Sequence, residues 1–428
     1  MNPRPPAADE ETALAAELTI LEMGAEGEGM ARQGDRAFYL AGALPGETVA
    51  ARIRGDKAEV AEILQPSPDR VLAPCSHFGV CGGCALQHWR DGPYAAWKLA
   101  RLQRLLGREG LSPDFLPTFQ ALPGTRRRLA LHARRAERGG GARLGFKEKG
   151  AWTLVDISQC VVATPGLNAA LPALAKLASA FLGHAKSAPT LHVTETETGL
   201  DIDVTGVESG ARGFSGDQRA RVCDVAAAHN LARVTLSGET LYSARPPRIL
   251  FDGVSVALPP GSFLQAVAAA ERQMAQDACQ ALQGAKKVAD FFCGAGAFSF
   301  PLAKQAQVFA FDSAPLGIAA LKQAAGEAPG RKAVAAEVRD LFRRPLSVKE
   351  MKGFDGAVFD PPRAGASAQA DALARSDIPT VVGVSCNPAT FVRDAKILVS
   401  GGYRLNRIRL VDQFLWSAHM EVVGVFEK

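Results

Sequence analysis

Val381–Pro388 (VVGVSCNP) is the stretch that decides the fold. Its apolar run is typical of a buried strand, and an Asn-Pro pair ends that strand directly after Cys386. Ala357–Arg363 (AVFDPPR) has the same design, with an apolar strand that ends at Asp360 and two prolines. Two parallel strands joined by one crossover helix place both ends on the rim where α/β sheets bind ligands. We therefore expect Asp360 and Cys386 to be neighbours, with the Cys386 thiol as a candidate nucleophile.

The length of the chain, 428 residues, exceeds what one core normally supports and predicts two or three domains. An apolar content of 47% and a mean hydropathy of +0.01 are typical of a soluble protein with substantial cores. No apolar run reaches about 18 residues, which predicts no membrane span. The net charge of +5 permits a nucleic-acid partner without demonstrating one. The acidic, Pro-rich start differs from a secretory signal, so we expect a disordered lead (1–16) and a cytoplasmic protein.

Strand patterns dominate the first 256 residues. Residues 17–66 read as four or five short strands of a small closed barrel. Residues 94–110 read as a helix with leucines on its buried face and Lys98, Arg101 and Arg104 on its wet face. Two hairpins follow, one around a Gly-rich tip at 139–141 and one that turns near Gly199. Seven arginines between positions 126 and 143 leave two interpretations open, a phosphate-contacting surface and a solvated face.

Strands and helices alternate from about residue 261 onward. A helical pattern comes first, and seven strand patterns follow it, the last two without room for a helix between them. This order predicts a doubly wound sheet with an antiparallel edge.

The loop after the first of these strands, Asp290–Ser299 (DFFCGAGAFS), is typical of cofactor-binding turns. Gly294 and Gly296 let the backbone turn tightly beneath a ligand. Asp312 ends the next strand, where a carboxylate can accept the two ribose hydroxyls. Together with Asp340 and Asp360 after the following strands, this spacing indicates S-adenosylmethionine rather than NAD. Capping a helix is the alternative role for each of these acids.

Three of the eight cysteines form a cluster, Cys75-x5-Cys81-x2-Cys84. In a reducing compartment, clustered thiols indicate a metal rather than disulfides. With Cys160 as a distant fourth ligand, the spacing suits a tetrahedral zinc site. An all-thiolate set also suits a [4Fe–4S] cluster, and both remain open at this point.

Five motifs in order resemble the RNA uracil-C5 methyltransferase family: FLQAV (263–267), DFFCGAGAFSFPLA, FDPPRAG, SCNP and AHMEVVGVFEK. The segments GEGMA and GALPGE resemble the TRAM domain, an RNA-binding barrel. With CSHFGVCGGCALQH, the resemblance runs from about residue 17 to the end. It is closest to the iron–sulfur-containing 23S ribosomal RNA 5-methyluridine branch, which favours the [4Fe–4S] cluster over zinc.

The resemblance implies a multi-domain α/β fold. A TRAM-like β-barrel would span 17–66 and a central, mostly β domain with the cluster 67–256. A Rossmann-like methyltransferase domain would span 257–428, with the 94–110 helix returning to pack on it.

The resemblance also implies roles for individual residues. A thiolate that adds to C6 of uracil makes C5 nucleophilic, and Cys386 fits that role. Glu421, in AHME, is the implied base that removes the C5 proton, although an exposed strand-end carboxylate is the ordinary alternative. His419 would orient or support, and Arg363 would meet RNA or hold the DPP turn. The implied cofactor contacts are Gln265, Phe292, Asp312, Asp340 and Asp360.

The expected partners are RNA, 23S ribosomal RNA with transfer RNA as the alternative, and neither a membrane nor an obligate protein partner. Val267 and Ala297 depart from the family pattern, where polar residues are common. Two rival functions remain open. DPPR (360–363) resembles a motif of amino-group methyltransferases, although these enzymes have no use for Cys386. The two departures would also fit a non-catalytic RNA-binding factor.

Overall fold

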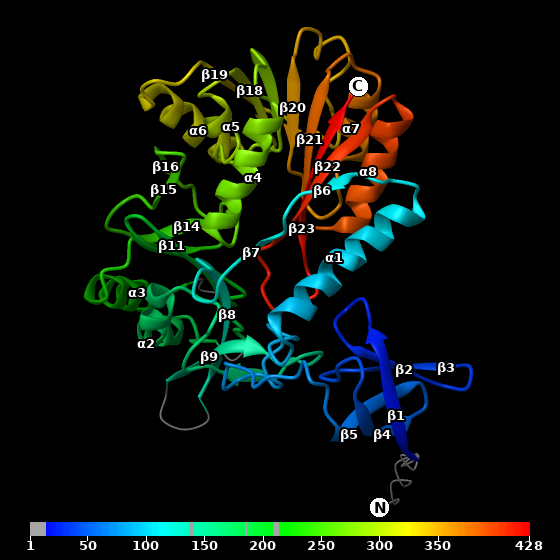
Figure 1. The fold of residues 1–428 in the computed structure, drawn as a ribbon. Coiled ribbons are helices and arrows are strands. Elements are labelled where there is room, and N and C mark those ends of the chain that lie inside the picture. The colour runs from blue at the N-terminus through cyan, green and yellow to red at the C-terminus, as the bar shows by residue number, and fades with distance from the viewer. Residues whose placement is uncertain (1–13, 137–140, 185, 209–213) are drawn as a thin grey trace, which may run out of the picture. The chain divides into compact units, whose positions relative to one another are not determined.

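A computed structural model of the chain describes residues 14–136, 141–184, 186–208 and 214–428 (Figure 1). The lead predicted over 1–16 lies outside the described residues up to position 13, as do positions 139–140 of the predicted hairpin tip. The chain divides into two compact units. One comprises Met1–Arg101 and Trp416–Ala418, and the other comprises Leu102–Leu415 and His419–Lys428.

Five antiparallel strands form the N-terminal sheet, in the order β3-β2-β1-β4-β5. Leu18, Ile20, Phe38, Leu40 and Val49 are buried on one side of it and form its core. The strand pattern over 17–66 predicted these strands, but the expectation of a closed barrel is wrong. Among the described residues β3 and β5 are the two edges of the sheet, so the strands build an antiparallel half-barrel. The strands are β1 (Leu14–Met23), β2 (Gly29–Gln33), β3 (Arg36–Leu40), β4 (Thr48–Arg54) and β5 (Lys57–Gln65).

Helix α1 spans Asp91–Arg108 and begins three residues earlier than predicted. Leu102 and Leu106 are buried, as the leucine pattern indicated. Lys98, however, is fully buried, and its predicted place on the wet face is wrong. Its ammonium lies 5.0 Å from the ring centroid of Tyr94, and such a cation–π contact compensates part of the lost hydration.

The central sheet has seven strands in the order β10-β9-β8-β11-β12-β13-β14. The sequence missed its two helices, α2 (Pro165–Ala180) and α3 (Gly216–Ala228). Thr164 caps α2 ahead of a proline, and Ser215 forms a capping box with Gln218 in α3. The strands are β8 (Arg128–Arg135), β9 (Ala142–Lys147), β10 (Leu154–Asp156), β11 (Thr190–Thr196), β12 (Gly199–Thr205), β13 (Arg233–Leu236) and β14 (Glu239–Ser243), and a separate hairpin pairs β15 (Arg248–Phe251) with β16 (Val254–Ala257).

The C-terminal sheet runs in the order β19-β18-β17-β20-β21-β23-β22-β6, and β7 also pairs with β22. Its first five strands are parallel, and β23 is antiparallel to both neighbours, as the doubly wound pattern predicted. The edge beyond β22 comes from outside the predicted domain, because β6 (Asp114–Phe115) and β7 (Phe119–Gln120) add to it. The other strands are β17 (Lys287–Phe291), β18 (Gln307–Asp312), β19 (Val334–Val338), β20 (Gly356–Phe359), β21 (Thr380–Ser385), β22 (Arg404–Asp412) and β23 (Glu421–Glu427).

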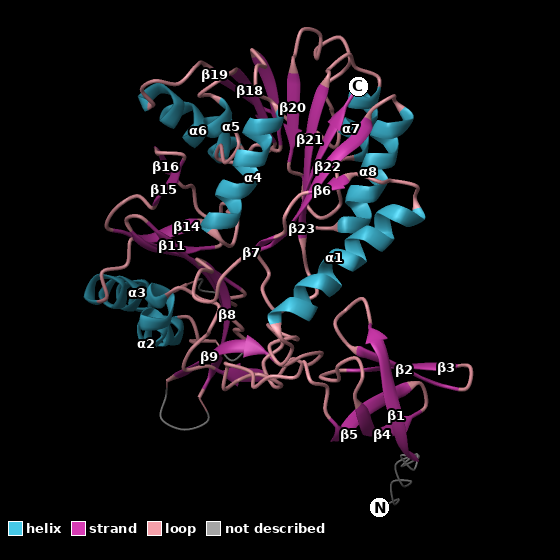
Figure 2. Cartoon of the chain, in the orientation of Figure 1, coloured by secondary structure: helices cyan, strands magenta, loops and turns pink. Residues whose placement is uncertain are grey.

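Helices cover both faces of this sheet, which explains the near-continuous apolar runs of its strands (Figure 2). Helices α4 (Ala268–Ala281), α5 (Ser299–Leu302) and α6 (Pro315–Glu327) pack on one face. Helices α7 (Ser367–Ala374) and α8 (Pro388–Ser400) pack on the other, with Leu102 and Leu106 of α1. Gly383 and Gly424 face each other across β21 and β23, where an added Cβ would lie 2.7 Å from Phe359 and 2.5 Å from Phe391.

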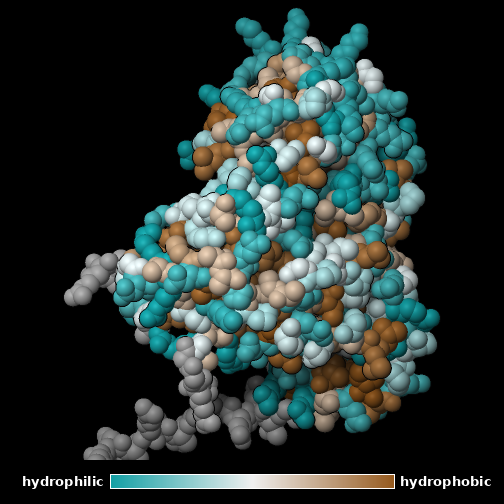
Figure 3. Space-filling model, turned by 90° about the vertical axis from the view of Figure 1, so that its left-hand side faces the viewer, coloured by the Kyte–Doolittle hydropathy of each residue, from teal (hydrophilic) through white to brown (hydrophobic). Residues whose placement is uncertain are grey.

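None of the described helices is both long and apolar enough to cross a membrane. On the face drawn in Figure 3, hydrophobic side chains lie in separate patches among hydrophilic ones.

Candidate active site

The loop that follows β17 combines two glycines with a strained phenylalanine. Phe292 has a φ of 63°, a left-handed conformation that costs a non-glycine residue about 1 kcal/mol or more. Gly294 and Gly296 also have positive φ, and a Cβ on Gly296 would lie 2.6 Å from the Phe300 ring. The Phe292 ring lies 5.5 Å from that of Phe342, in the loop after β19. These features keep the backbone close to the sheet edge and put an aromatic pair beside it.

Asp312 and Asp340 both hold backbone turns at this edge. Asp312 accepts hydrogen bonds from the Gly294 amide (2.9 Å) and the Ala314 amide (2.8 Å), so it ties the glycine loop to the end of β18. Asp340 accepts from the Phe342 amide at 3.0 Å and also from the amide after it. A carboxylate has about four acceptor positions, so both acids can still accept from ribose or adenine.

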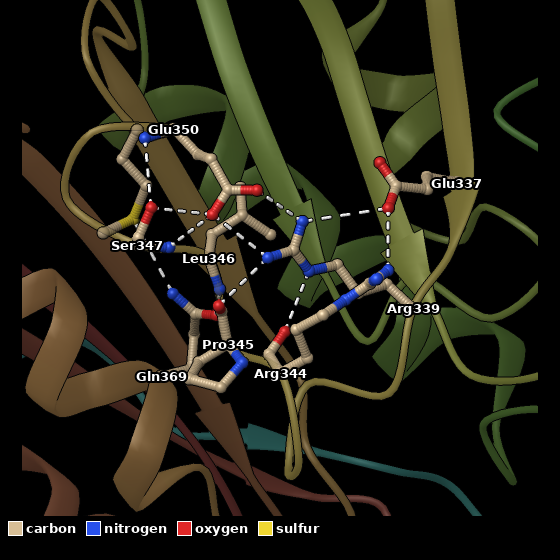
Figure 4. Close-up of polar contacts among 9 residues, drawn as sticks. Glu337, Arg339, Arg344, Pro345, Leu346, Ser347, Glu350 and Gln369 are labelled. Carbon is tan, nitrogen blue, oxygen red and sulfur yellow. Dashed lines mark hydrogen bonds and ion pairs between the residues drawn. The ribbon is translucent and has the colours of Figure 1, made fainter.

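Arg339 holds the loop that carries Asp340 and Phe342 (Figure 4). Its buried guanidinium donates to the two carboxylate oxygens of Glu350 (2.7 and 3.1 Å) and to the carbonyls of Arg344 (2.8 Å) and Pro345 (3.1 Å). The hydrogen bond from Arg339, followed by those from the Ser347 amide and hydroxyl, lowers the pKa of Glu350 to about 2. The pair therefore stays charged at neutral pH and closes the loop on itself.

A chain of hydrogen bonds joins four polar side chains from separate segments. Gln265 Nε2 donates to Asp360 Oδ2 at 3.1 Å. Gln413 Nε2 donates to both Gln265 Oε1 (2.7 Å) and Glu421 Oε2 (2.5 Å). The structure thus brings the predicted residues Gln265, Asp360 and Glu421 together. Glu421 is only 2% exposed, so the alternative of an exposed strand-end carboxylate is wrong.

Sequence reasoning missed Gln413 and Arg127. Gln413, in the β22–β23 connection, also accepts a bond from the Val267 amide at 3.4 Å. Arg127 donates from Nε to the Gln265 carbonyl (3.1 Å) and forms an ion pair with Glu271 (2.7 Å). A single buried amide or arginine carries no periodic signal in a sequence.

Cys386 stands at the end of β21 and is partly buried. Asn387 fixes the backbone after it, because its side chain accepts from the Ala389 amide (3.1 Å) at the start of α8 and donates to the Arg363 carbonyl (3.2 Å). Arg363 itself is exposed, and its charge offsets only part of the rise in the pKa of Cys386 that burial causes. The DPP turn and the cysteine turn are therefore bonded to each other, as their shared rim predicted.

Burial and mutual repulsion control the charges in this site. Burial, followed by the charge of Asp360, raises the pKa of Glu421 to about 8. Burial also raises the pKa of Asp360 to about 7. The pKa of Cys386 is raised as well, by burial first and then by the charges of Glu421 and Asp360. Beneath the glycine loop, burial raises the pKa of Asp290 to about 7, and its Oδ1 has no hydrogen-bond partner. The site therefore favours neutral carboxyl groups and a neutral thiol while it is empty of ligand charge.

Two of the arginines considered for phosphate contact serve the fold instead. Arg127 is buried, and Arg128 donates to the carbonyls of Leu264 (2.5 Å) and Ser262 (3.4 Å). Both hold the segment before α4 that presents Gln265. His419 is exposed, and its ring lies 6.0 Å from that of Phe414.

The thiols of the predicted cluster are all partly buried. Cys75, Cys81 and Cys84 lie in the loop between β5 and α1, where the Gly83 amide donates to Cys81 Sγ at 3.5 Å. Cys160 lies between β10 and α2, and its backbone is bonded to Asn168. The all-thiol donor set suits a cluster, but in the part of the chain that the structure describes no three His, Cys, Asp or Glu side chains form a metal-binding group.

Known proteins resemble this chain over nearly its whole length. The family model "tRNA (Uracil-5-)-methyltransferase" matches residues 331–428. An uncharacterized RNA methyltransferase of Caulobacter vibrioides is 54% identical over 96% of this chain and 100% of its own length. A 23S rRNA (uracil(1939)-C(5))-methyltransferase of Chromohalobacter salexigens is 33% identical over 96% of this chain and 88% of its own. The chain belongs to the RNA uracil-C5 methyltransferase family.

A member of this family is an S-adenosylmethionine-dependent RNA (uracil-5-)-methyltransferase, and the site has the groups such an enzyme needs. The Pyrococcus abyssi tRNA (uracil-54, C5)-methyltransferase, solved with S-adenosyl-L-homocysteine, has the same fold. It superposes with a TM-score of 0.73, covers 96% of this chain and 99% of its own, and is 23% identical. The glycine loop, the Phe292–Phe342 pair and the acids around them fit S-adenosylmethionine, which supplies an electrophilic methyl group when bound.

Proposed function

We propose that the enzyme methylates C5 of one uridine through a transient covalent bond between Cys386 Sγ and C6. Cys386 attacks C6 as a thiolate, which leaves an electron pair at C5 that takes up the methyl group. Glu421 then removes the C5 proton, so that the C6–sulfur bond breaks and the thiolate leaves. The target uridine must leave its stack, because a thiol on a sheet rim cannot approach C6 inside a helix.

The observation that carries this proposal is the position of Glu421 beside Cys386. Ser385 pairs with Val422 across β21 and β23, so the next residue pair along the two strands is Cys386 and Glu421. A pKa of about 8 also suits Glu421 as a base near neutral pH, because it holds the C5 proton strongly once it has taken it.

Support for the cofactor contacts comes from the same rim. Gln265 and Asp360 are bonded to each other next to Cys386, and we assign them to the methionyl end of the donor. Asp312 and the glycine loop would take the ribose, and Phe292, Phe342 and Asp340 the adenine. These assignments keep the donor and the thiol on one side of the sheet.

As the target we propose 23S ribosomal RNA, with transfer RNA as the alternative. The Chromohalobacter relative, at 33% identity, supports the first. We also propose that the N-terminal half-barrel is a TRAM domain, and that Cys75, Cys81, Cys84 and Cys160 bind a [4Fe–4S] cluster rather than zinc. The cluster takes no part in the methyl transfer described above.

One experiment tests the reaction and its target together. The enzyme is incubated with labelled S-adenosylmethionine and total RNA from a strain that lacks it, and the labelled RNA is separated by size and mapped. Label at uracil C5 in 23S RNA supports the proposal, and label in transfer RNA supports the alternative. Label on nitrogen would instead indicate an amino-group methyltransferase and overturn it.

Metal analysis of anaerobically purified protein tests the cluster. We expect roughly four iron and four sulfide per chain, and their loss in Cys84→Ser. One zinc ion and no sulfide per chain would show that these cysteines bind zinc instead of a cluster.

A further inference from the structure

One face of the central sheet carries cations that the methyl-transfer site does not use. In β8 the side chains alternate, with Leu129, Leu131 and Ala133 buried and Arg134 on the opposite face. The strand register pairs Arg134 with Arg143 of β9, and Lys147 follows on the same face. Helix α2 packs against β8 and β9, whose leucines are buried, while Arg134, Arg143 and Lys147 on the opposite face stay partly exposed.

The direct pairing of Arg134 with Arg143 is unfavourable by itself, since like charges opposite each other destabilise a strand pair. Asp156 offsets part of this repulsion, because its Oδ2 forms an ion pair with Arg143 Nε at 3.7 Å. Among the described residues no carboxylate forms an ion pair with Arg134, which donates a hydrogen bond to the Ala133 carbonyl at 2.9 Å. Two adjacent guanidinium groups are well suited to donate hydrogen bonds to phosphate oxygens.

Trp152, in the turn between β9 and β10, lies beside these cations. It is 79% exposed, whereas Trp89, Trp97 and Trp416 are each less than 8% exposed. The Lys147 ammonium lies 3.6 Å from its ring centroid. The Lys147 ammonium covers one side of the indole. Because Trp152 is so exposed, the other side of the ring stays open to a flat ligand.

The cations of β8 and β9 lie on the same face of the sheet as His132. His132 of β8 lies on the same face, hydrogen-bonded to Thr190 Oγ1 at 2.9 Å. Burial and then the charges of Lys147, Arg134 and His192 lower the pKa of His132, so these cations converge on it. His132 is therefore neutral at pH 7 and adds no further repulsion.

We propose that Trp152, Lys147, Arg134 and Arg143 form a second RNA contact, in which the indole stacks on an unpaired base and the guanidinium groups bind the phosphates beside it. An exposed aromatic ring among cations is the arrangement by which proteins bind single-stranded nucleic acid. The inference rests on the RNA substrate of the family, and it is independent of the proposed target and of the covalent step. It assigns to the central sheet the binding of a nucleotide other than the reacting uridine.

The fluorescence of Trp152 provides a direct test, because it is the one exposed tryptophan of four. The full-length enzyme is titrated with single-stranded oligouridylate of about 12 nucleotides. The quenching of tryptophan fluorescence and the fluorescence anisotropy of labelled RNA are measured in parallel. We expect the wild type to be quenched, and Trp152→Phe to bind with nearly the same Kd without that quenching. Trp152→Ala should bind roughly tenfold more weakly.

Three results would overturn the inference: no quenching of the wild type, equal quenching of Trp152→Phe, or wild-type affinity in Trp152→Ala. Methyl transfer to unmodified RNA gives an independent readout, in which Trp152→Ala raises KM for RNA and leaves kcat unchanged. Lys147→Ala should likewise raise KM for RNA, whereas the control Lys322→Ala, which removes an exposed charge from α6, should leave it unchanged. A failed covalent mechanism would appear in the Cys386 adduct and not in these measurements.

Discussion

Cys386 and Glu421 continue one strand pair: Ser385 is opposite Val422 in the antiparallel ladder of β21 and β23, and these two residues come next in the register. Their charges are coupled, since Glu421 contributes to the raised pKa of Cys386. Antiparallel pairing holds two such side chains about 5 Å apart at Cβ. One thiol and one carboxyl group can therefore act on adjacent atoms of a single ring.

Removing the base should trap the enzyme on its substrate. Glu421→Gln keeps the shape of the side chain but cannot take the C5 proton, so the methylated adduct accumulates. We expect a slower-migrating protein–RNA species on denaturing gels with Glu421→Gln, and none with Cys386→Ala. An adduct of equal yield from Cys386→Ala would show that another residue attacks C6.

The activity should depend on pH through Glu421. A carboxyl group with a pKa of about 8 is protonated below that pH and cannot serve as a base. We therefore expect kcat/KM to rise with pH through about 8, and to keep rising above it, because burial raises the pKa of the Cys386 thiol that must act as a thiolate. A profile that is flat between pH 6 and 9 would contradict this assignment.

Gln413 should set the position of that profile. Its hydrogen bond to Glu421 lowers the pKa of this carboxyl group, against the larger effect of burial. Gln413→Met has a similar volume and removes the bond, so the rising limb of kcat/KM should move to higher pH. A uniform loss of rate without that shift would indicate that Gln413 only supports the fold.

Arg339 should control the affinity for the methyl donor through its loop. Arg339→Met leaves Glu350 without its partner and loosens the turn of Asp340 and Phe342, so we expect KM for S-adenosylmethionine to rise roughly tenfold while kcat changes little. Lys349→Met is the control, because Lys349 is an exposed cation between β19 and β20, in the same loop as Arg339. Equal effects of the two substitutions would argue against the role of Arg339.

The buried Asp290 should make the protein less stable as pH rises. Its pKa is about 7 in the folded state against 3.8 ordinarily, so the folded state keeps a proton that the unfolded chain releases. Its contribution to stability is complete below about pH 4 and is lost as pH rises to about 7, at up to about 1.4 kcal/mol per pH unit. Asp290→Asn does not titrate, and urea unfolding from pH 4 to 8 should show a flatter dependence than the wild type. If the free energies of unfolding of the wild type and of Asp290→Asn depended on pH in the same way, the titrating group would be a residue other than Asp290.

The sequence alone determined the order of elements and the rim on which chemistry occurs. Apolar runs that end in Asp360 and Cys386 could be read as strands because a parallel strand buried on both faces needs an unbroken apolar stretch. The positions of the loop glycines, of Asp312 and of Glu421 followed from motifs at fixed distances along the chain. Helices α2 and α3 were missed because strand patterns surround them and their caps are short-range signals.

Only the tertiary structure decided which polar groups share a site and which charges are buried. Gln413 meets Gln265, 148 positions away, because the sheet brings distant segments together. Arg127 and Lys98 look like surface residues in the sequence, since burial depends on what packs over a side chain. Likewise, strand register decides that Arg127 and Arg128 hold the fold, whereas Arg134 and Arg143 lie side by side on one sheet face. Local sequence sets backbone conformation, whereas the environment of a charge is set by contacts that the sequence does not encode locally.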